Sequence, residues 1–228
     1  MTSGWTLPTA LVILSVGLAL PTHGQSLSSP PIDDLVRNLQ TKYDSVRDFS
    51  ADFEHSYSGG VLRTSIVEYG TVLIKKPGKM RWRYTSSEEK LYISDGKIFY
   101  SFFPVDQQVI VAEVPPDDQQ GSTPALFLAG KGSLADDFKA AYANEPEMPD
   151  SWVVRLTPKT SDADYELLTL TVDRESLTIT GLSTEDVQGG RSSYRFTNLV
   201  ENRGVPDSSF DFEIPENAHV IRQNAPTR

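Results

Sequence analysis

Cysteine is absent from the 228 residues of the sequence. This absence excludes any disulfide and any lipid-modified N-terminal cysteine, so an oxidising compartment is permitted but not used for cross-linking. Histidine is scarce as well, with three residues at positions 23, 55 and 219. None of them stands near a second histidine at the spacing of a zinc or haem site. We therefore expect no metal and no other cofactor, and we interpret His55 as a surface or core residue.

Sequence motifs of catalysis are also missing. There is no Gly-x-Ser-x-Gly pattern of a nucleophilic serine. The stretch GKGS, residues 130–133, lacks the earlier glycine and the spacing of a phosphate-binding loop, so we interpret it as a helix stop. Adjacent acidic pairs such as Asp33-Asp34 and Asp136-Asp137 are typical of solvated surface. Catalysis by two separated carboxylates stays open, but we expect that the protein is not an enzyme.

Positively charged residues are fewer than negatively charged ones. Lys and Arg number 21 against 31 Asp and Glu, which gives a net charge of -10. An acidic surface argues against binding to nucleic acid and against adsorption to anionic lipid. We expect no nucleic acid among the partners.

Charge of either sign is absent from side chains of the first 24 residues, apart from His23. An apolar run from Ala10 to Leu20 is followed there by proline and small residues, a pattern typical of a secretory signal peptide and too short for a membrane span. We predict a signal peptide over residues 1–24, cleaved after Gly24; an uncleaved membrane anchor is the alternative. Residues 25–228, about 200 in number, are expected to form a single domain.

Two segments have helical patterns. Residues 30–46 carry apolar residues three and four positions apart, which predicts a helix with one apolar face. Pro31 suits its first turn, and Asp33 and Asp34 complement the positive end of the helix dipole. Residues 123–138 combine Pro124 near a helix start with Gly130 as a stop, so we expect one or two short helices.

The other segments alternate with a period of two, which predicts strands. The sequences FSADFEHSY, VLRTSIVEYGTVLIKK, MRWRY, KLYIS, KIFYSFF and VIVAEV come first; SWVVRLTPK, DYELLTLTVD, LTITGLSTED, RSSYRFTNLV and FDFEIP follow the second helical segment. Asp95-Gly96 predicts a tight hairpin between two of them. Ten or eleven strands at hairpin spacing predict a barrel or a strongly curved antiparallel sheet.

The strand KKPGKMRWRY, residues 75–84, has an unusually bulky face. Met80, Trp82 and Tyr84 share one face, whereas Arg81 and Arg83 share the other and are expected to face solvent. Large aromatics that we assign to the same inner face are Phe49, Phe53, Tyr100 and Phe102. An inner face of this kind forms either a filled core or the wall of a cavity. The short helical segment that interrupts the strands stands where a movable lid would be.

Several of these stretches resemble a known family in the right order. They are GTVLIKKPGKMRWRY, LYISDGKIFYSFFPVDQQV, TPALFLAG, VVRLTPK, RSSYRFTNLVEN and FDFEIPENAHVI. Together they resemble the periplasmic carriers of outer-membrane lipoproteins (LolA-like), from about Leu35 to Val220. The resemblance implies an incomplete antiparallel β-barrel of about eleven strands with an α-helical lid over a hydrophobic cavity, no enzymatic activity and no cofactor.

The resemblance also implies residue roles. In this family an arginine before the proline of the Pro-Gly-Lys block holds the lid shut through hydrogen bonds to lid carbonyls. Lys76 stands there instead, and because lysine lacks the planar fork of arginine, a weaker or different latch is expected. Trp82 matches the aromatic on the cavity side. We expect the lipid-binding cavity to be lined by Phe53, Leu73, Met80, Trp82, Tyr84, Ile93, Tyr100, Phe102, Leu126 and Phe127.

The family implies a monomeric carrier in the periplasm. It would take acylated lipoproteins from an ATP-driven (ABC-type) lipoprotein-releasing transporter of the inner membrane and deliver them to an outer-membrane receptor. The alternative is a periplasmic sensor or regulatory module that binds lipid or protein with the same half-barrel.

Overall fold

The structure is a computed structural model that describes Met1 and residues 29–59, 64–114, 128–130, 133–143, 148–160 and 165–223. The predicted signal peptide over residues 1–24 lies, apart from Met1, outside the described residues. The described strands are β1 (Asp48–Gly59), β2 (Thr64–Lys75), β3 (Lys79–Tyr84), β4 (Lys90–Asp95), β5 (Ile98–Phe103), β6 (Gln108–Glu113), β7 (Phe138–Tyr142), β8 (Ser151–Pro158), β9 (Leu167–Asp173), β10 (Ile179–Glu185), β11 (Arg191–Glu201) and β12 (His219–Gln223). The described part of the chain is thus mainly β.

The predicted N-terminal helix is confirmed. α1 covers Ile32–Ser45, with Pro31 at its N-cap and two acidic residues in its first turn. Its buried residues recur every three or four positions because they share the face that packs on the sheet: Leu35, Val36, Leu39 and Tyr43. None of the helices in the described residues is long and apolar enough to cross a membrane.

All twelve described strands join one sheet in the order β12-β6-β5-β4-β3-β2-β1-β11-β10-β9-β8-β7. Consecutive strands pair antiparallel from β1 to β6 and from β7 to β11, and β1 also pairs antiparallel with β11. β12 adds to β6 in parallel, so one edge departs from the antiparallel pattern. The terminal strands β12 and β7 are not neighbours, and the predicted unclosed barrel is therefore confirmed.

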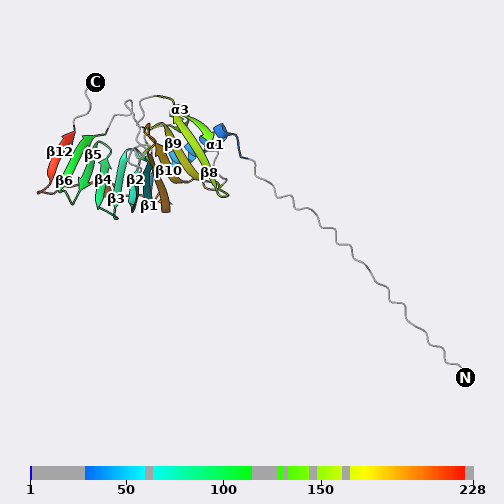
Figure 1. Cartoon of the computed structure of the whole chain (residues 1–228), viewed down its shortest axis with the longest axis horizontal. Coiled ribbons are helices and arrows are strands. Elements are labelled where there is room, and N and C mark those ends of the chain that lie inside the picture. Colours follow the sequence, from blue (N-terminus) through cyan, green and yellow to red (C-terminus); the bar gives the residue numbers. More distant parts are fainter. Residues whose placement is uncertain are drawn as a thin grey trace.

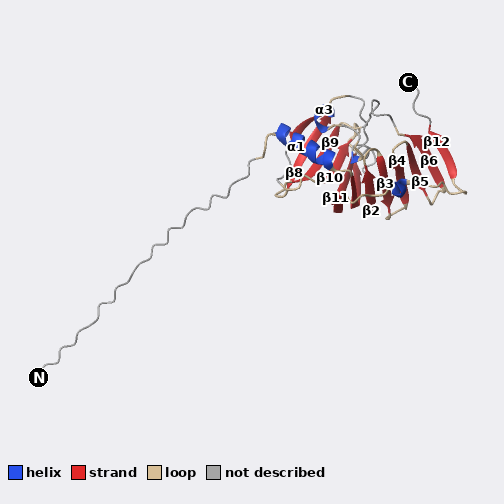
Figure 2. Cartoon of the chain, turned by 180° about the vertical axis from the view of Figure 1, so that it is seen from behind, coloured by secondary structure: helices blue, strands red, loops and turns tan. Residues whose placement is uncertain are grey.

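One face of this sheet, here called the inner face, is covered in part by α1. Figures 1 and 2 show α1 and α3 (Leu134–Asp137) beside the end formed by β8, β9 and β10, whereas β4, β5, β6 and β12 lie toward the other end. The buried core includes Leu39 and Tyr43 of α1 together with Phe49, Val154 and Phe196 of the sheet. The empty space remaining between α1 and β10–β11 is only about 30 Å³. The helix therefore fills this part of the inner face as an ordinary core.

The opposite, outer face is covered by a C-terminal strap, which we define as residues 202–214. It contains the short 3-10 helix η2 (Asp207–Phe210), whose Phe210 is 1% exposed. Arg81 donates a hydrogen bond to the carbonyl of Ser209 (2.9 Å), and Lys75 and Lys79 pair with Asp207. The prediction of a strand at FDFEIP, residues 210–215, is therefore wrong. The apolar side chains of this segment pack on the outer face, so they are covered although the segment does not pair with a strand of the sheet.

Candidate functional site

The inner face holds a cavity of about 380 Å³ where α1 does not cover it. Strands β1–β5, β10 and β11 form its walls, and Leu128 from the lid segment closes part of it. The lining residues are His55, Glu68, Met80, Trp82, Tyr84, Lys90, Tyr92, Phe99, Leu128, Leu182, Thr184, Ser192 and Tyr194. The sheet thus has both arrangements expected for a bulky inner face, a filled core beneath α1 and a cavity beside it.

The structure brings four of the predicted lining residues together on the inner face. Met80, Trp82 and Tyr84 line the cavity itself. Phe53 lies behind them, with its ring 5.2 Å from that of Trp82 and 4.9 Å from that of Tyr84. Edge-on contacts of this kind are a favoured geometry for aromatic pairs. This part of the wall is therefore a packed aromatic surface.

Four other predicted lining residues lie on the outer face, so their assignment to the cavity side is wrong. Cross-strand partners point to the same side of a sheet, and the register places Leu73 and Ile93 opposite Arg81, while Tyr100 is paired with Ile93 and Phe102 with Leu91. Even-numbered residues face the cavity side in β4, where Tyr92 and Ser94 lie beside Trp82 and Met80. After the Asp95-Gly96 turn the odd-numbered residues face that side, because Tyr92 pairs with Ser101 and Ser94 with Phe99. A shift of one residue reverses every side chain beyond it.

These outer-face residues have a different role in packing. Tyr100 and Phe102 stack against Phe212 of the strap, with ring centroids 5.2 and 5.7 Å apart. Ile93 is completely buried on the same side. Apolar residues of β4 and β5 therefore lie on both faces of the sheet. Those on the inner face line the cavity, and those on the outer face pack against the strap. The remaining predicted lining residues, Leu126 and Phe127, lie outside the described residues.

The described lid segment, residues 128–130, is held by backbone hydrogen bonds. The N–H of Gly78 donates to the carbonyl of Ala129 (2.8 Å), which ties the lid to the turn between β2 and β3. The N–H of Gly130 donates to the hydroxyl of Tyr43 (3.0 Å), which ties it to α1. The lid is therefore closed over the end of the cavity that lies near the β2–β3 turn.

Lys76 lies between α1 and this lid segment. Its ammonium donates to the carbonyl of Tyr43 (2.5 Å) and lies 3.1 Å from the centroid of the Tyr43 ring. Gly130 packs against its stem so closely that a Cβ at that position would be 2.8 Å from Cγ of Lys76. Burial lowers the pKa of Lys76 to about 8, although Asp44 and Glu201 oppose the shift. The hydrogen bond thus goes to the helix rather than to lid carbonyls, and Lys76 touches the lid through its aliphatic stem.

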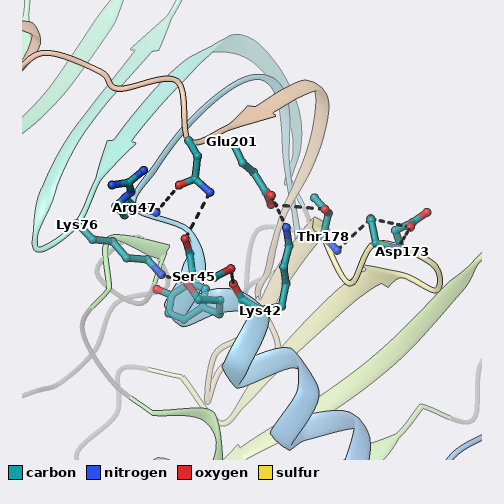
Figure 3. A network of polar contacts seen from close by, with 10 residues as sticks. Lys42, Ser45, Arg47, Lys76, Asp173, Thr178 and Glu201 are labelled. Atoms are coloured by element: carbon teal, nitrogen blue, oxygen red, sulfur yellow. Dashed lines mark hydrogen bonds and ion pairs between the residues drawn. The ribbon is translucent and has the colours of Figure 1, made fainter.

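The same end of α1 is fixed by further polar contacts (Figure 3). Lys42 pairs with Glu201 at the end of β11, and Glu201 also accepts from Thr178. Asn202 accepts from the N–H of Arg47 (2.8 Å) and donates to the carbonyl of Ser45 (3.3 Å). Cations and amide donors at a helix C-terminus satisfy carbonyls that lack partners within the helix. The C-terminal end of α1, against which the lid closes, is therefore a fixed support.

Sequence reasoning missed a polar cluster in the cavity wall. The Glu68 carboxylate, whose side chain is 9% exposed, accepts from the Lys90 ammonium at 2.6 Å. Its other oxygen lies 3.6 Å from Nδ1 of His55. Burial lowers the pKa of His55, and Glu68 opposes the shift. The available signal was Glu68 itself, since it shares its strand face with Val72 and Ile74 and a carboxylate on a buried face needs a partner.

Hydroxyl groups extend this cluster. Tyr84 and Tyr194 share a hydrogen bond of 3.1 Å, and Nε2 of His55 lies 2.9 Å from Oγ of Ser192. Burial raises the pKa of Tyr84 and of Tyr194, so both remain neutral hydroxyls. Nε1 of the buried Trp82 has no hydrogen-bond partner among the described residues. A buried donor without an acceptor is rare in proteins.

An unclosed, strongly curved sheet with a helix and a lid on its inner face defines a half-barrel class of proteins with a lidded cavity. Within this class, residues 44–213 match the family model described as "Outer membrane lipoprotein carrier protein LolA". The chain therefore belongs to the LolA family.

Individual relatives agree with this assignment. The chain is 35% identical to an outer-membrane lipoprotein carrier protein of Chromohalobacter salexigens over 92% of its own length and 96% of that protein. It is 32% identical to the protein of the same name from Pseudomonas putida, covering 68% of this chain and 72% of that one. Among solved structures, an uncharacterised conserved protein of Thermus thermophilus shares the fold at 8% identity, with a TM-score of 0.52, 84% of this chain and 98% of that chain being covered.

Proposed function

We propose that this protein is a periplasmic carrier that shields the acyl chains of lipoproteins during their passage between two membranes. The observation that carries the proposal is the lidded cavity of about 380 Å³, whose wall includes Met80, Trp82, Phe99 and Leu128. Each CH₂ group removed from water contributes about 0.8 kcal/mol, so several long chains do not leave a membrane without such a shelter. The names of the relatives agree with this role.

The size of the cavity indicates how loading works. About 380 Å³ is near the lower end of the range of pockets that enclose a small molecule. Three long acyl chains need more room than this. Loading therefore requires the lid segment to move away from Tyr43 and Gly78, which together hold it by the two backbone hydrogen bonds described above.

The remaining roles follow from the family. The cargo would come from an ABC-type transporter of the inner membrane and pass to an outer-membrane receptor, while the carrier acts as a monomer without catalysis or cofactor. Delivery then needs only a favourable difference in affinity between carrier and receptor. The protein would reach the periplasm through the predicted signal peptide, so N-terminal sequencing of the exported protein should begin near Gln25.

The direct test is the identity of the bound cargo. The protein is purified from the periplasm and the molecules that co-purify are identified by mass spectrometry. We expect acylated lipoproteins, and we expect a triacylated peptide to displace the fluorescent probe ANS from the native protein. Recovery of a stable regulatory protein in place of lipoproteins, together with no displacement of ANS, would favour a sensor and contradict the carrier.

A further inference from the structure

The cavity is not uniform along the strands. The register places Met80 beside Ser94 and Phe99, at the end near the lid. Two residues further along β3, Trp82 lies beside Tyr92. This end of the cavity wall is therefore mainly apolar and aromatic.

The opposite end is polar. Continuing along β3, Tyr84 lies beside Lys90, and on the neighbouring strands His55 pairs with both Glu68 and Tyr194. Beyond them, Thr184 pairs with Ser192. Because side chains on one face recur every second residue, these rows succeed one another along the strand direction. The cavity wall therefore changes from hydrocarbon to hydrogen-bonding groups over its length.

The polar end carries no net charge. Lys90 and Glu68 neutralise each other across 2.6 Å, and the lowered pKa of His55 keeps its ring neutral at pH 7. Tyr84 and Tyr194 remain protonated because burial raises the pKa of each. An anionic headgroup would meet Glu68, and a cationic one would meet Lys90. A neutral polar ligand meets neither penalty.

Hydrogen-bond donors are in excess at this end. Among the described residues, Glu68 is the one hydrogen-bond partner of the Lys90 ammonium, which has three N–H groups. Next to this end, Nε1 of Trp82, two residues before Tyr84 on β3, has no partner within the described chain. Carbonyl oxygens are the neutral groups that accept such hydrogen bonds. A ligand with carbonyls next to its hydrocarbon would satisfy these donors while its chains occupy the apolar end.

We propose that the polar end, defined by His55, Glu68, Tyr84, Lys90 and Tyr194, binds the uncharged ester and amide carbonyls of the acylated cysteine of the cargo. This inference rests on the proposed carrier function and specifies the orientation of the cargo. The hydrocarbon ends point toward Leu128 and the β2–β3 turn. The carbonyls and the attached polypeptide lie toward Glu68 and Ser192.

The test compares two ligands that differ only in their carbonyls. One is a cysteinyl peptide with ester-linked palmitoyl chains, and the other is its ether-linked analogue with chains of the same length. Binding of each to the full-length mature protein is measured by displacement of ANS. We expect the ester ligand to bind about tenfold more tightly, because a hydrogen bond to a charged donor contributes about that factor.

The variant Lys90→Met with Glu68→Gln removes the ion pair without leaving an unpaired buried charge. It should lose the preference for the ester ligand and keep the affinity for the ether ligand. The matched control is Arg83→Met with Glu89→Gln, an exposed pair 2.9 Å apart between the outer face of β3 and the residue before β4. It should keep the preference. Should the first variant fail to fold, Trp82→Phe keeps an aromatic ring, removes the unpaired donor and should reduce the preference.

The outcomes separate this inference from the function on which it rests. If the wild type binds neither ligand, the carrier function is contradicted. If it binds both equally, the carrier function stands and the polar end is not a carbonyl site. A diester phospholipid of the same chain length is tested in parallel. Ester preference with the phospholipid alone would retain the carbonyl site and overturn the lipoprotein as its cargo.

Discussion

Gly130 allows the lid to pack against Lys76, the predicted latch, because glycine has no side chain. Its φ of +88° belongs to the region that favours glycine, and Lys76 occupies the volume that a side chain would need. Lys76 is itself held in place by the carbonyl and the ring of Tyr43. A methyl group at this position would therefore clash with Lys76 when the lid is closed.

We predict that Gly130→Ala opens the lid. The added Cβ would lie 2.8 Å from Cγ of Lys76, and the positive φ costs about 1–2 kcal/mol for any other residue. The expected result is stronger ANS binding and faster hydrogen exchange at the amides of Gly78 and residue 130. Gly189→Ala is the matched control, because Gly189 has a φ of +76° but nothing within 4 Å. Equal behaviour of the two variants would show that contact with Lys76 does not hold the lid.

Lys76 also makes the stability depend on pH. Its pKa of about 8 in the folded protein is below the 10.5 of the unfolded chain, so between these values the unfolded chain binds the extra proton. The free energy of unfolding of the wild type should therefore rise between pH 8 and 10 relative to Lys76→Met. Urea denaturation of both proteins at pH 7 and pH 9.5 measures this difference. A constant difference would mean that the lysine titrates normally and is solvated.

The strap buries apolar side chains of the outer face. Phe210 is 1% exposed, and Asp48, 4% exposed, accepts hydrogen bonds from the N–H groups of Arg203 and Gly204 at its start. The strap covers apolar residues of β4 and β5, such as Ile93, Tyr100 and Phe102, that would otherwise be exposed on the side away from the cavity. It thus allows β4 and β5 to be apolar on both faces.

Phe210→Ala should be among the more damaging substitutions. Loss of a fully buried phenylalanine costs about 3–5 kcal/mol, and we expect the strap to become sensitive to protease. Phe212→Ala provides the comparison, because Phe212 is only partly buried against Tyr100 and Phe102. Its stability loss in urea denaturation should be smaller. If both variants unfold at the same urea concentration, the strap is not anchored through Phe210.

In the molecule as a whole, α1, the sheet and the lid meet at Lys76. The cation is held by the C-terminal end of α1, which Lys42, Glu201 and Asn202 fix to β11. The C-terminal end of α1 therefore supports both the lid of the cavity and the core. A change at this point should affect transfer of cargo more than the fold.

We predict that Lys76→Leu loads cargo but does not release it. Without the cation the lid has a weaker closed state to return to, so closing no longer expels the chains. Lys76→Arg is the conservative control and should keep transfer, because it retains a charged donor. A pulse-chase of lipoprotein from loaded carrier to outer membranes measures the effect. Normal transfer by Lys76→Leu would contradict the latch.

Local patterns were sufficient for α1 and for most of the strands. A period of 3.6 or 2 reflects the geometry of a single helix or strand, so residues 30–46 and the alternation of Met80, Trp82 and Tyr84 could be interpreted without knowledge of their neighbours. The tight turn at Asp95-Gly96 follows from the same local chemistry, with Gly96 at a φ of +97°. The bulky inner face of β3 was predictable for this reason.

The assignment of faces beyond that turn required the folded molecule. Tyr100 and Phe102 have the alternation of an inner face, but the register between β4 and β5 turns them outward, and only the strap from residues 202–214 explains their burial. The polar end of the cavity joins His55, Glu68, Lys90 and Tyr194, which are far apart in the chain. Strand periodicity specifies that two faces exist, whereas register and long-range pairing specify what each face meets.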